Sequence, residues 1–318
     1  VPDSGCGSWL FEPQSTNLVP YSEDFSQSSW SKGSDISIES GYLAPDGNNT
    51  AYKVTKTGGG APLLSSNQSL ITTTTRSIYA RTVSGTGKIS LLSYFGNSNN
   101  LFDVTEQWQR FEINSANATG VANFYAVDFR SLSTTLSEVI LWGANATNDQ
   151  DYATSYIPTE GSTVTRNQDV CTSGGSLASI NSTEGVLYAE IAKNSLSNNN
   201  QISISLSSGS TNNRVMFFTG ANSQQINCQV RSSGSTWYSS SFNLLAGSTN
   251  FNKIAIKYKE NDFSFWVNGS KINQATTGVT PLGLNELAFD VGSSANNFFG
   301  KTKALAVWKE ALSDEELA

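Results

Sequence analysis

Short runs in which apolar and polar residues alternate recur along the whole chain, and they restrict its fold more than any other feature. Residues 36–39 and 77–83 alternate in the first half, and residues 186–191, 253–259 and 262–267 do so in the second. A period of two places successive side chains on opposite faces of a strand. The runs follow one another at a spacing of roughly 8–12 residues, so the sequence predicts an all-β sandwich or barrel.

The composition agrees with short strands joined by many turns. Charged residues make up 14% of the 318 residues, against roughly 25% in ordinary globular domains, and turn-forming Asn, Ser and Gly take their place. The net charge of −7 disfavours a nucleic-acid partner, because an acidic surface repels phosphate backbones. The sequence contains no apolar run of about 18 residues, so we expect no membrane insertion.

The alternating pattern lapses once, in the middle of the chain. Residues 143–158 are polar, and strand-like character returns only at Gly185. We therefore predict a linker over residues 161–182 and two tandem antiparallel β-sandwich (jelly-roll) domains, residues 1–165 and 166–318.

Three segments of the second half carry sharper predictions. Residues 253–259 alternate between charged or Tyr residues and apolar ones, which predicts a half-buried strand with a hydrated outer face. The dipeptide Asn268-Gly269 is typical of a tight hairpin turn. Ser313, followed by the acidic residues 314–316, predicts the N-cap and first turn of a short helix.

The chain contains no histidine and three cysteines. Without histidine, a Ser-His-Asp triad, a Cys-His dyad and a His-ligated zinc site are impossible, and only carboxylate, Lys or Tyr chemistry remains. Cys6, Cys171 and Cys228 have two interpretations: one disulfide with one thiol left over, or three small buried residues.

A catalytic carboxylate pair of the kind that glycosidases need is not evident. Glu286 and Asp290 have the spacing to share one face of a strand, but residues 287–289 between them are typical of an ordinary strand. We therefore expect that the chain binds a ligand and is not an enzyme.

Aromatic side chains are the first candidates for a binding site, because sugars stack on flat aromatic faces. Trp237 and Tyr238 lie in a polar, Ser-rich stretch without an evident core strand. They form either a stacking platform or an ordinary pair within a sheet. The remaining tryptophans in or beside strand patterns are predicted to pack in a core: Trp30, Trp108, Trp142, Trp266 and Trp308.

Two polar segments supply the oxygen ligands that calcium prefers. Asp46 and Asn48 lie in one of them, and Asp149 and Asp151 lie in the other. Each segment is either part of a structural calcium site or a solvated turn.

The second half resembles the laminin-G/concanavalin-A-like lectin domains. The resemblance rests on residues 251–258, on the hairpin at residues 265–269 and on the ending at residues 304–317, a last strand followed by Leu-Ser-Asp-Glu-Glu-Leu. It implies a jelly-roll sandwich and says little about the ligand.

The first half resembles carbohydrate-binding-module-like jelly rolls. The resemblance rests on residues 10–25 with Trp30 at the start, and on residues 141–144 and 153–159 at the end. The tandem arrangement is similar to structural proteins of tailed bacteriophages, among them tail fibres and head-decorating fibres. Related domains also occur in secreted bacterial polysaccharide-degrading enzymes and adhesins.

This resemblance implies an extracellular protein on the surface of a virion. We expect it to mediate adhesion to host-surface glycans or to decorate the particle. Its partners would be polysaccharides and other virion proteins, and the chain would form a homo-oligomer. The alternative is the carbohydrate-binding region of a secreted bacterial polysaccharide-degrading enzyme or adhesin.

Overall fold

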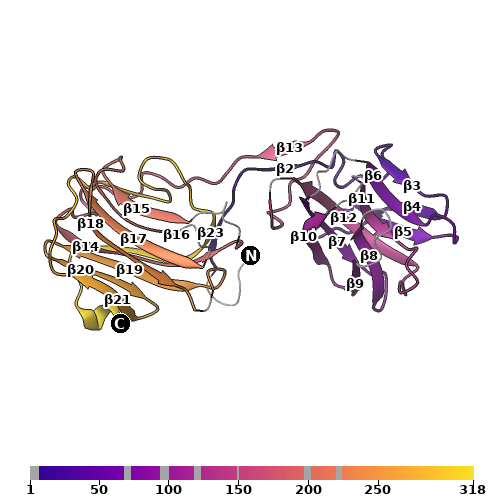
Figure 1. The fold of residues 1–318 in the computed structure, drawn as a ribbon. Coiled ribbons are helices and arrows are strands. Elements are labelled where there is room, and N and C mark those ends of the chain that lie inside the picture. Colours follow the sequence, from indigo (N-terminus) through magenta and orange to yellow (C-terminus); the bar gives the residue numbers. More distant parts are fainter. Residues whose placement is uncertain are drawn as a thin grey trace. The chain divides into compact units, whose positions relative to one another are not determined.

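The computed structural model describes residues 7–67, 73–93, 100–117, 123–148, 150–196, 202–219, 224–245 and 247–318. Strands dominate this part of the chain, and its one helix is α1 (Asp314–Leu317). The chain divides into two compact units (Figure 1). Residues Gln14–Asn167 form the N-terminal domain, and the residues up to Pro13 together with Gln168–Ala318 form the C-terminal domain. The predicted all-β fold of tandem sandwiches is confirmed.

The N-terminal domain is a sandwich of two five-stranded antiparallel sheets. Its strands are β2 (Ser15–Asn17), β3 (Trp30–Lys32), β4 (Ile36–Tyr42), β5 (Ala51–Lys56), β6 (Leu63–Asn67), β7 (Thr73–Arg81), β8 (Gly87–Ser93), β9 (Leu101–Val104), β10 (Gln109–Asn117), β11 (Asn123–Asp128), β12 (Glu138–Thr147) and β13 (Val164–Arg166). One sheet has the order β10-β7-β12-β5-β4 and the other β3-β6-β11-β8-β9, while β2 and β13 pair as a separate ribbon. Side chains from both sheets, such as Ile78 and Leu64, are completely buried in one core.

The start of this domain is held by a buried polar side chain. Asn17, which is fully buried, donates from Nδ2 to the carbonyl oxygens of Ala144 (3.0 Å) and Ile157 (2.8 Å). Its Oδ1 accepts from the backbone amides of Val19 and Ala146, each at 3.1 Å. Four hydrogen bonds satisfy the side-chain amide of Asn17, so its burial leaves neither its nitrogen nor its oxygen without a partner. Asn17 thereby ties the first residues of the domain to β12 and to the segment that follows it.

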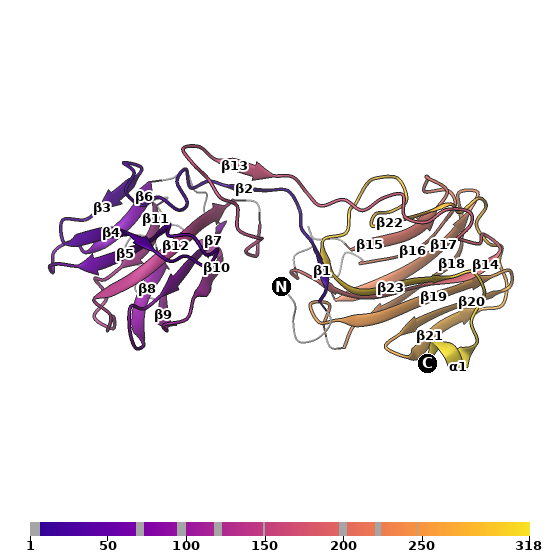
Figure 2. The ribbon, with the colours of Figure 1, turned by 180° about the vertical axis from the view of Figure 1, so that it is seen from behind.

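The C-terminal domain is a second sandwich, of a six-stranded and a five-stranded antiparallel sheet (Figure 2). Its strands are β1 (Trp9–Phe11), β14 (Glu184–Lys193), β15 (Ser203–Ser207), β16 (Arg214–Thr219), β17 (Gln225–Ser232), β18 (Ser235–Asn243), β19 (Asn252–Lys259), β20 (Asp262–Val267), β21 (Ser270–Ala275), β22 (Glu286–Ala288) and β23 (Gly300–Trp308). The orders are β1-β23-β14-β19-β20-β21 and β18-β17-β16-β15-β22. The core between the sheets includes Leu187, Phe217 and Ile256, all completely buried.

The observed domain limits differ from the predicted ones at the N-terminus. The predicted first domain begins at residue 1, whereas β1 pairs antiparallel with β23 of the C-terminal domain, with Phe11 opposite Gly300. The second limit, between Asn167 and Gln168, lies two residues from the predicted one. A three-residue strand is too short to show a period, so its partner could not be inferred from alternation.

Strand β19 shows the period-two arrangement, with two changes from the prediction. Ile254, Ile256 and Tyr258 point into the core, and burial raises the pKa of the Tyr258 hydroxyl, which donates to the carbonyl oxygen of Asn181 at 2.7 Å. The expected hydrated outer face holds for Lys253. It is wrong for Lys257, which is only 8% exposed, and for Tyr258, which the prediction grouped with the charged residues but which is completely buried.

The hairpin and the terminal helix form as predicted. Asn268 and Gly269 have φ values of +50° and +78°, as a type I′ turn between β20 and β21 requires. Ser313 caps α1 in a capping box: its Oγ accepts from the amide of Glu316, whose side chain accepts from the amide of Ser313 at 2.8 Å. Among the described residues, no helix is both long enough and apolar enough to cross a membrane.

Candidate functional site

The outer face of the six-stranded sheet contains a groove of about 700 Å³. Tyr188 of β14, Ala255 of β19 and Trp266 of β20 contribute side chains to it. Ala255 lies directly opposite Tyr188 on one side and Trp266 on the other. Because a methyl group stands between two large rings, the sheet surface is hollow at this position.

Two of the aromatic rings in the groove are accessible to a ligand. Trp308 at the end of β23 and Phe251 just before β19 are each 37% exposed. The ring of Trp308 lies 6.2 Å from that of Tyr188 at an interplanar angle of 71°. Trp266 is only 5% exposed and belongs to the floor, where its Nε1 donates to Ser264 Oγ at 2.9 Å.

Polar groups of mixed charge surround these rings. Glu190 of β14 lies opposite Lys253 of β19 in the register, and its Oε1 is 3.8 Å from the Nζ of Lys303. The Nζ of Lys303 also lies 5.6 Å from the centre of the Phe251 ring. Asn268 is held in place because its Oδ1 accepts from the amide of Lys253 at 2.8 Å. The groove therefore combines aromatic faces with a carboxylate, an ammonium group and an amide.

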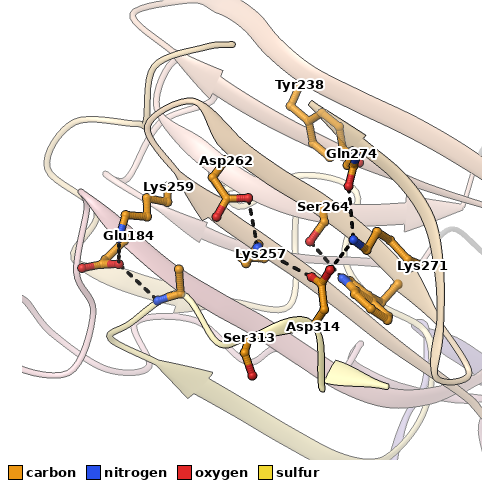
Figure 3. Close-up of polar contacts among 12 residues, drawn as sticks. Glu184, Tyr238, Lys257, Lys259, Asp262, Ser264, Lys271, Gln274, Ser313 and Asp314 are labelled. Atoms are coloured by element: carbon orange, nitrogen blue, oxygen red, sulfur yellow. Dashed lines mark hydrogen bonds and ion pairs between the residues drawn. The ribbon is translucent and has the colours of Figure 1, made fainter. Parts of the chain in front are cut away.

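A network of ion pairs fastens α1 to the same sheet (Figure 3). The Nζ of Lys257 lies 3.0 Å from Asp262 Oδ1 and 3.8 Å from Asp314 Oδ1, and Lys271 contacts the other oxygen of Asp314. The hydrogen bond from Lys271, supported by the charge of Lys257, lowers the pKa of the Asp314 carboxyl. In Figure 3 Lys257 of β19 and Lys271 of β21 both point to Asp314 at the start of the helix, and Asp262 of β20 meets Lys257.

The helix and the segment before it form one wall of the groove. Leu312 and Leu317 pack against a small apolar cluster of Val186, Ala255 and Trp266 on the outer face. Glu316 and the last residue of the sequence, Ala318, also line the groove. The C-terminal segment thus shapes the site and covers Lys257.

The structure separates the two predicted ligand-binding residues. Trp237 is 46% exposed, but Tyr238 is only 4% exposed and its ring stacks on Phe263 at 5.8 Å. The Tyr238 hydroxyl donates to the carbonyl oxygen of Asn273 at 3.0 Å, and burial raises its pKa. Both residues lie on β18, an edge strand that the polar sequence did not reveal. A stacking platform there would use Trp237 alone, and its role stays a prediction.

The predicted calcium ligands occupy two separate places. Asp46 accepts hydrogen bonds from the backbone amide (3.0 Å) and the side-chain amide (2.9 Å) of Asn48, and these bonds lower the pKa of Asp46. Asp149 lies outside the described residues, and Asp151 is half-buried. Within the described part of the chain, no group of three or more His, Cys, Asp or Glu side chains could hold a metal ion. A structural calcium ion stays a prediction.

Glu286 and Asp290 have structural partners. Glu286 Oε1 accepts from Ser207 Oγ at 2.9 Å. Asp290, which is 1% exposed, accepts from the backbone amides of Gly292 and Ser294 and so holds the turn after β22.

The structure describes two of the three cysteines. Cys171 and Cys228 are free thiols, and Cys6 lies outside the described residues.

The prediction that the strand tryptophans pack in a core is wrong for Trp308, which lines the groove. Trp30, Trp142 and Trp266 are buried as expected and Trp108 is half-buried against the cluster around Trp142, whereas Trp308 is exposed in the groove. Strand alternation contains the signal that could have revealed it. Leu305 and Val307 pack against the core, so Trp308 must face outward.

Comparisons with known proteins support this description of the C-terminal domain. Residues 165–318 match the model of a family described as "Concanavalin A-like lectin/glucanases superfamily". No curated protein matches the chain. The β-sandwich fold and this match make the C-terminal domain similar to concanavalin A-like lectin domains. The resemblance predicted for the second half is thereby confirmed, and the one for the first half stays a prediction.

Solved structures give distant similarities only. The CBM40 of the Ruminococcus gnavus IT-sialidase bound to alpha2,3 sialyllactose is 16% identical with a TM-score of 0.34, over 43% of this chain and 82% of that one. Domain 4 of AbnA, a GH43 arabinanase from Geobacillus stearothermophilus in complex with arabinotriose, is 14% identical with a TM-score of 0.37, over 47% and 71%. Sheep galectin-11 in complex with glycerol is 11% identical with a TM-score of 0.31, over 44% and 97%. At these values the similarity says nothing about a ligand of this chain.

Proposed function

We propose that the protein binds carbohydrate through the groove on the outer face of its lectin-like domain. The observation that carries the proposal is the exposed ring of Trp308 beside Tyr188, in a groove that Phe251 and polar groups also line. An aromatic ring offers the apolar C–H face of a sugar a surface to pack on, while its hydroxyl groups need hydrogen-bond partners.

The polar groups of the groove supply both kinds of hydrogen-bond partner. Glu190 accepts hydrogen bonds when ionised, and Lys253 donates them. Because a shallow groove on one sheet face buries a limited part of a ligand, we expect weak binding at each site. Several copies of the domain would then act together through avidity.

For the biological setting, we propose an extracellular role on the surface of a bacteriophage virion, as a fibre or decoration protein that adheres to host-surface glycans. The proposal rests on the similarity of the tandem arrangement, and a homo-oligomer would provide the avidity. The carbohydrate-binding region of a secreted bacterial enzyme or adhesin fits the same groove equally well.

The binding proposal is tested with the Trp308→Ala variant on a glycan array. Trp237→Ala is the matched control, since it removes another exposed tryptophan from the same domain, on the other sheet. We expect at least a tenfold loss of affinity for Trp308→Ala and an unchanged affinity for Trp237→Ala. The reverse result would move the site to β18 and reject the groove.

A second variant, Ala255→Leu, fills the hollow and leaves every aromatic ring in place. We expect it to block binding as strongly as Trp308→Ala. Because Ala255 also packs against Leu312 and Leu317, the thermal unfolding midpoint is measured to establish that the variant is folded. Each glycan that binds is also incubated with the wild-type chain, and new reducing ends are measured. Their release at enzymatic rates would contradict a role limited to binding.

The setting is tested with antibodies against the chain. Labelling of intact phage particles by electron microscopy would support the virion role. Detection in culture fluid, within a longer secreted protein, would support the alternative.

A further inference from the structure

The N-terminal domain contains a groove of its own, of about 780 Å³. It lies between the segment from Tyr21 to Gln27, the paired strands β4 and β5, and residues 158–164. Its side chains include Tyr52 and three carboxylates, Glu23, Asp24 and Glu160. All the residues that line the groove belong to the N-terminal domain.

The first carboxylate of this groove is held rigidly. Asp24 Oδ1 accepts from the hydroxyl of Tyr52 at 2.6 Å and from the amide of Ser26 at 2.9 Å, and Oδ2 accepts from Gln27 Nε2 at 2.7 Å. Burial acts to raise the pKa of Asp24, but the hydrogen bonds from Gln27, Ser26 and Tyr52 outweigh it and lower the pKa to about 2. The group is therefore ionised and fixed at every ordinary pH.

The second carboxylate is positioned by a half-buried tyrosine. Glu23 Oε1 accepts from the hydroxyl of Tyr156 at 3.0 Å, and this hydroxyl lies 2.6 Å from Ser22 Oγ. The ring of Tyr156 packs on Trp142 at 4.8 Å. Because Tyr156 is anchored in this aromatic cluster, Glu23 has a defined place at the groove.

The part of the groove wall that Tyr21 and Glu160 form is also fixed by local contacts. Tyr21 and Glu160 form an isolated β-bridge, and the carbonyl oxygen of Tyr21 accepts from Trp30 Nε1 at 2.8 Å. Gly161 follows with a φ of +98°, and a Cβ atom there would lie 3.3 Å from the Tyr21 hydroxyl. The positive φ favours glycine at this position. A preformed groove loses little entropy when it binds a ligand.

The chemistry of the lining defines what the groove can take. It has hydrogen-bond acceptors in Glu23 and Glu160, amides in Gln27 and Asn49, and aromatic faces, while Asp24 contributes negative charge; no Lys or Arg is among its lining residues. Carboxylates repel an acidic ligand and accept hydrogen bonds from hydroxyl groups. The C-terminal groove differs, because Lys253 belongs to its lining.

We propose that this groove is a second binding site, specific for an uncharged saccharide, that acts independently of the C-terminal groove. The inference goes beyond the proposed function, since it concerns another domain and another ligand chemistry. It makes the protein a two-site binder that can hold an uncharged glycan by one domain while the other engages a different one.

The experiment uses the full chain with Trp308→Ala, so that the C-terminal groove is disabled. Retardation in native gels is measured with neutral polymers (mannan, laminarin and xylan), an acidic polymer (alginate) and a cationic polymer (chitosan). In this background Glu160→Ala removes an exposed acceptor from the groove, and Asn49→Ala removes an exposed amide. Asp103→Ala is the matched control, because Asp103 is an exposed carboxylate of the same domain on β9, outside the groove.

We expect the Trp308→Ala chain to retain at least one neutral polymer and to bind it at least tenfold more tightly than alginate or chitosan. Glu160→Ala should weaken that binding at least tenfold and Asn49→Ala several-fold, whereas Asp103→Ala should leave it unchanged. Thermal unfolding midpoints establish that each variant is folded.

Three results would overturn the proposal. One is that no neutral polymer binds the Trp308→Ala chain, and another is that alginate or chitosan binds more tightly than the neutral polymers. The third is that Glu160→Ala and Asn49→Ala both bind like the control. If the Trp308→Ala chain binds every polymer as tightly as the wild type does, the result contradicts the binding function proposed for the C-terminal groove. It does not contradict the N-terminal site, which Glu160→Ala and Asn49→Ala test separately.

Discussion

The ring of Phe11 stacks on that of Phe289, with the centroids 4.7 Å apart and an interplanar angle of 24°. Phe298 meets both rings edge-on, at 5.6 Å from Phe11 and 5.2 Å from Phe289. A residue near the start of the chain therefore completes the core of the C-terminal domain. This contact explains why β1 lies on the edge of that domain's sheet.

The first prediction follows from this cluster. Phe11→Ala should lower the free energy of unfolding of the C-terminal domain by about 2 kcal/mol, less than for a fully buried Phe because Phe11 is partly exposed. Urea unfolding measures the loss. Trp9→Ala is the control on the same strand, since Trp9 is 67% exposed and should change stability little. Equal effects of the two substitutions would show that the stacking contributes nothing specific.

The second prediction concerns the buried amide of Asn17. Asn17→Ala leaves the amides of Val19 and Ala146 and two carbonyl oxygens without their buried partner. We expect the N-terminal domain to lose about 2–4 kcal/mol, measured by calorimetry. Asn48→Ala, at an exposed turn, is the control and should cost far less. A loss below about 1 kcal/mol would mean that water replaces these hydrogen bonds.

The third prediction is a pH dependence that arises from Asp24. Its pKa is about 2 in the folded protein, below the ordinary value of 3.8 for an aspartate, so it stabilises the folded state above pH 3.8. That contribution is lost as the pH falls from about 4 to about 2. Because the side chain is partly exposed, solvent screening reduces the effect, and we expect about 1 kcal/mol.

The pH dependence is measured by hydrogen exchange in peptides of the N-terminal domain, at pH values from 6 to 2. Asp24→Asn should show about 1 kcal/mol less acid destabilisation than the wild type. Tyr52→Phe, which removes one of the hydrogen bonds to Asp24, should show an intermediate loss. Identical acid sensitivity in all three proteins would contradict the assignment to Asp24.

The fourth prediction concerns Cys228, which is 1% exposed on β17. Burial raises the pKa of this thiol to about 12. Because the thiolate is the reactive form, Cys228 should resist thiol reagents at pH 8 until the domain opens. Peptide mapping after timed labelling should show Cys171, which is half-exposed, reacting first. Equal labelling rates in the native protein would show that β17 is accessible.

Local patterns predicted much of the C-terminal sheet correctly. The strand at residues 253–259 and the turn at Asn268-Gly269 depend on near neighbours in the sequence, so a single chain segment contains their signal. The same holds for the capping box of Ser313 and Glu316. The edge strand β18 was missed because its side chains are mostly polar and exposed, which removes the alternation that marks a strand.

The groove residues could not be grouped from the sequence. Tyr188, Ala255, Trp266 and Trp308 come from four strands, β14, β19, β20 and β23. Of these, β19 and β20 are neighbours in both chain and sheet, whereas β14 pairs with β19 and β23 across long stretches of sequence. Alternation indicates which face a side chain takes, but it does not indicate the order of the strands. The site is consequently a product of sheet topology.

The sequence by itself determined the class of fold, the presence of two sandwiches and the inward or outward direction of most strand residues. These properties follow from period-two burial and from turn chemistry, which act over a few residues. Only the tertiary structure decided that β1 belongs to the C-terminal domain, that Trp308 faces a groove and that Asp24 meets Tyr52. Those contacts join residues that are distant in sequence, and they form because burial of apolar surface selects one order of strands for each sheet.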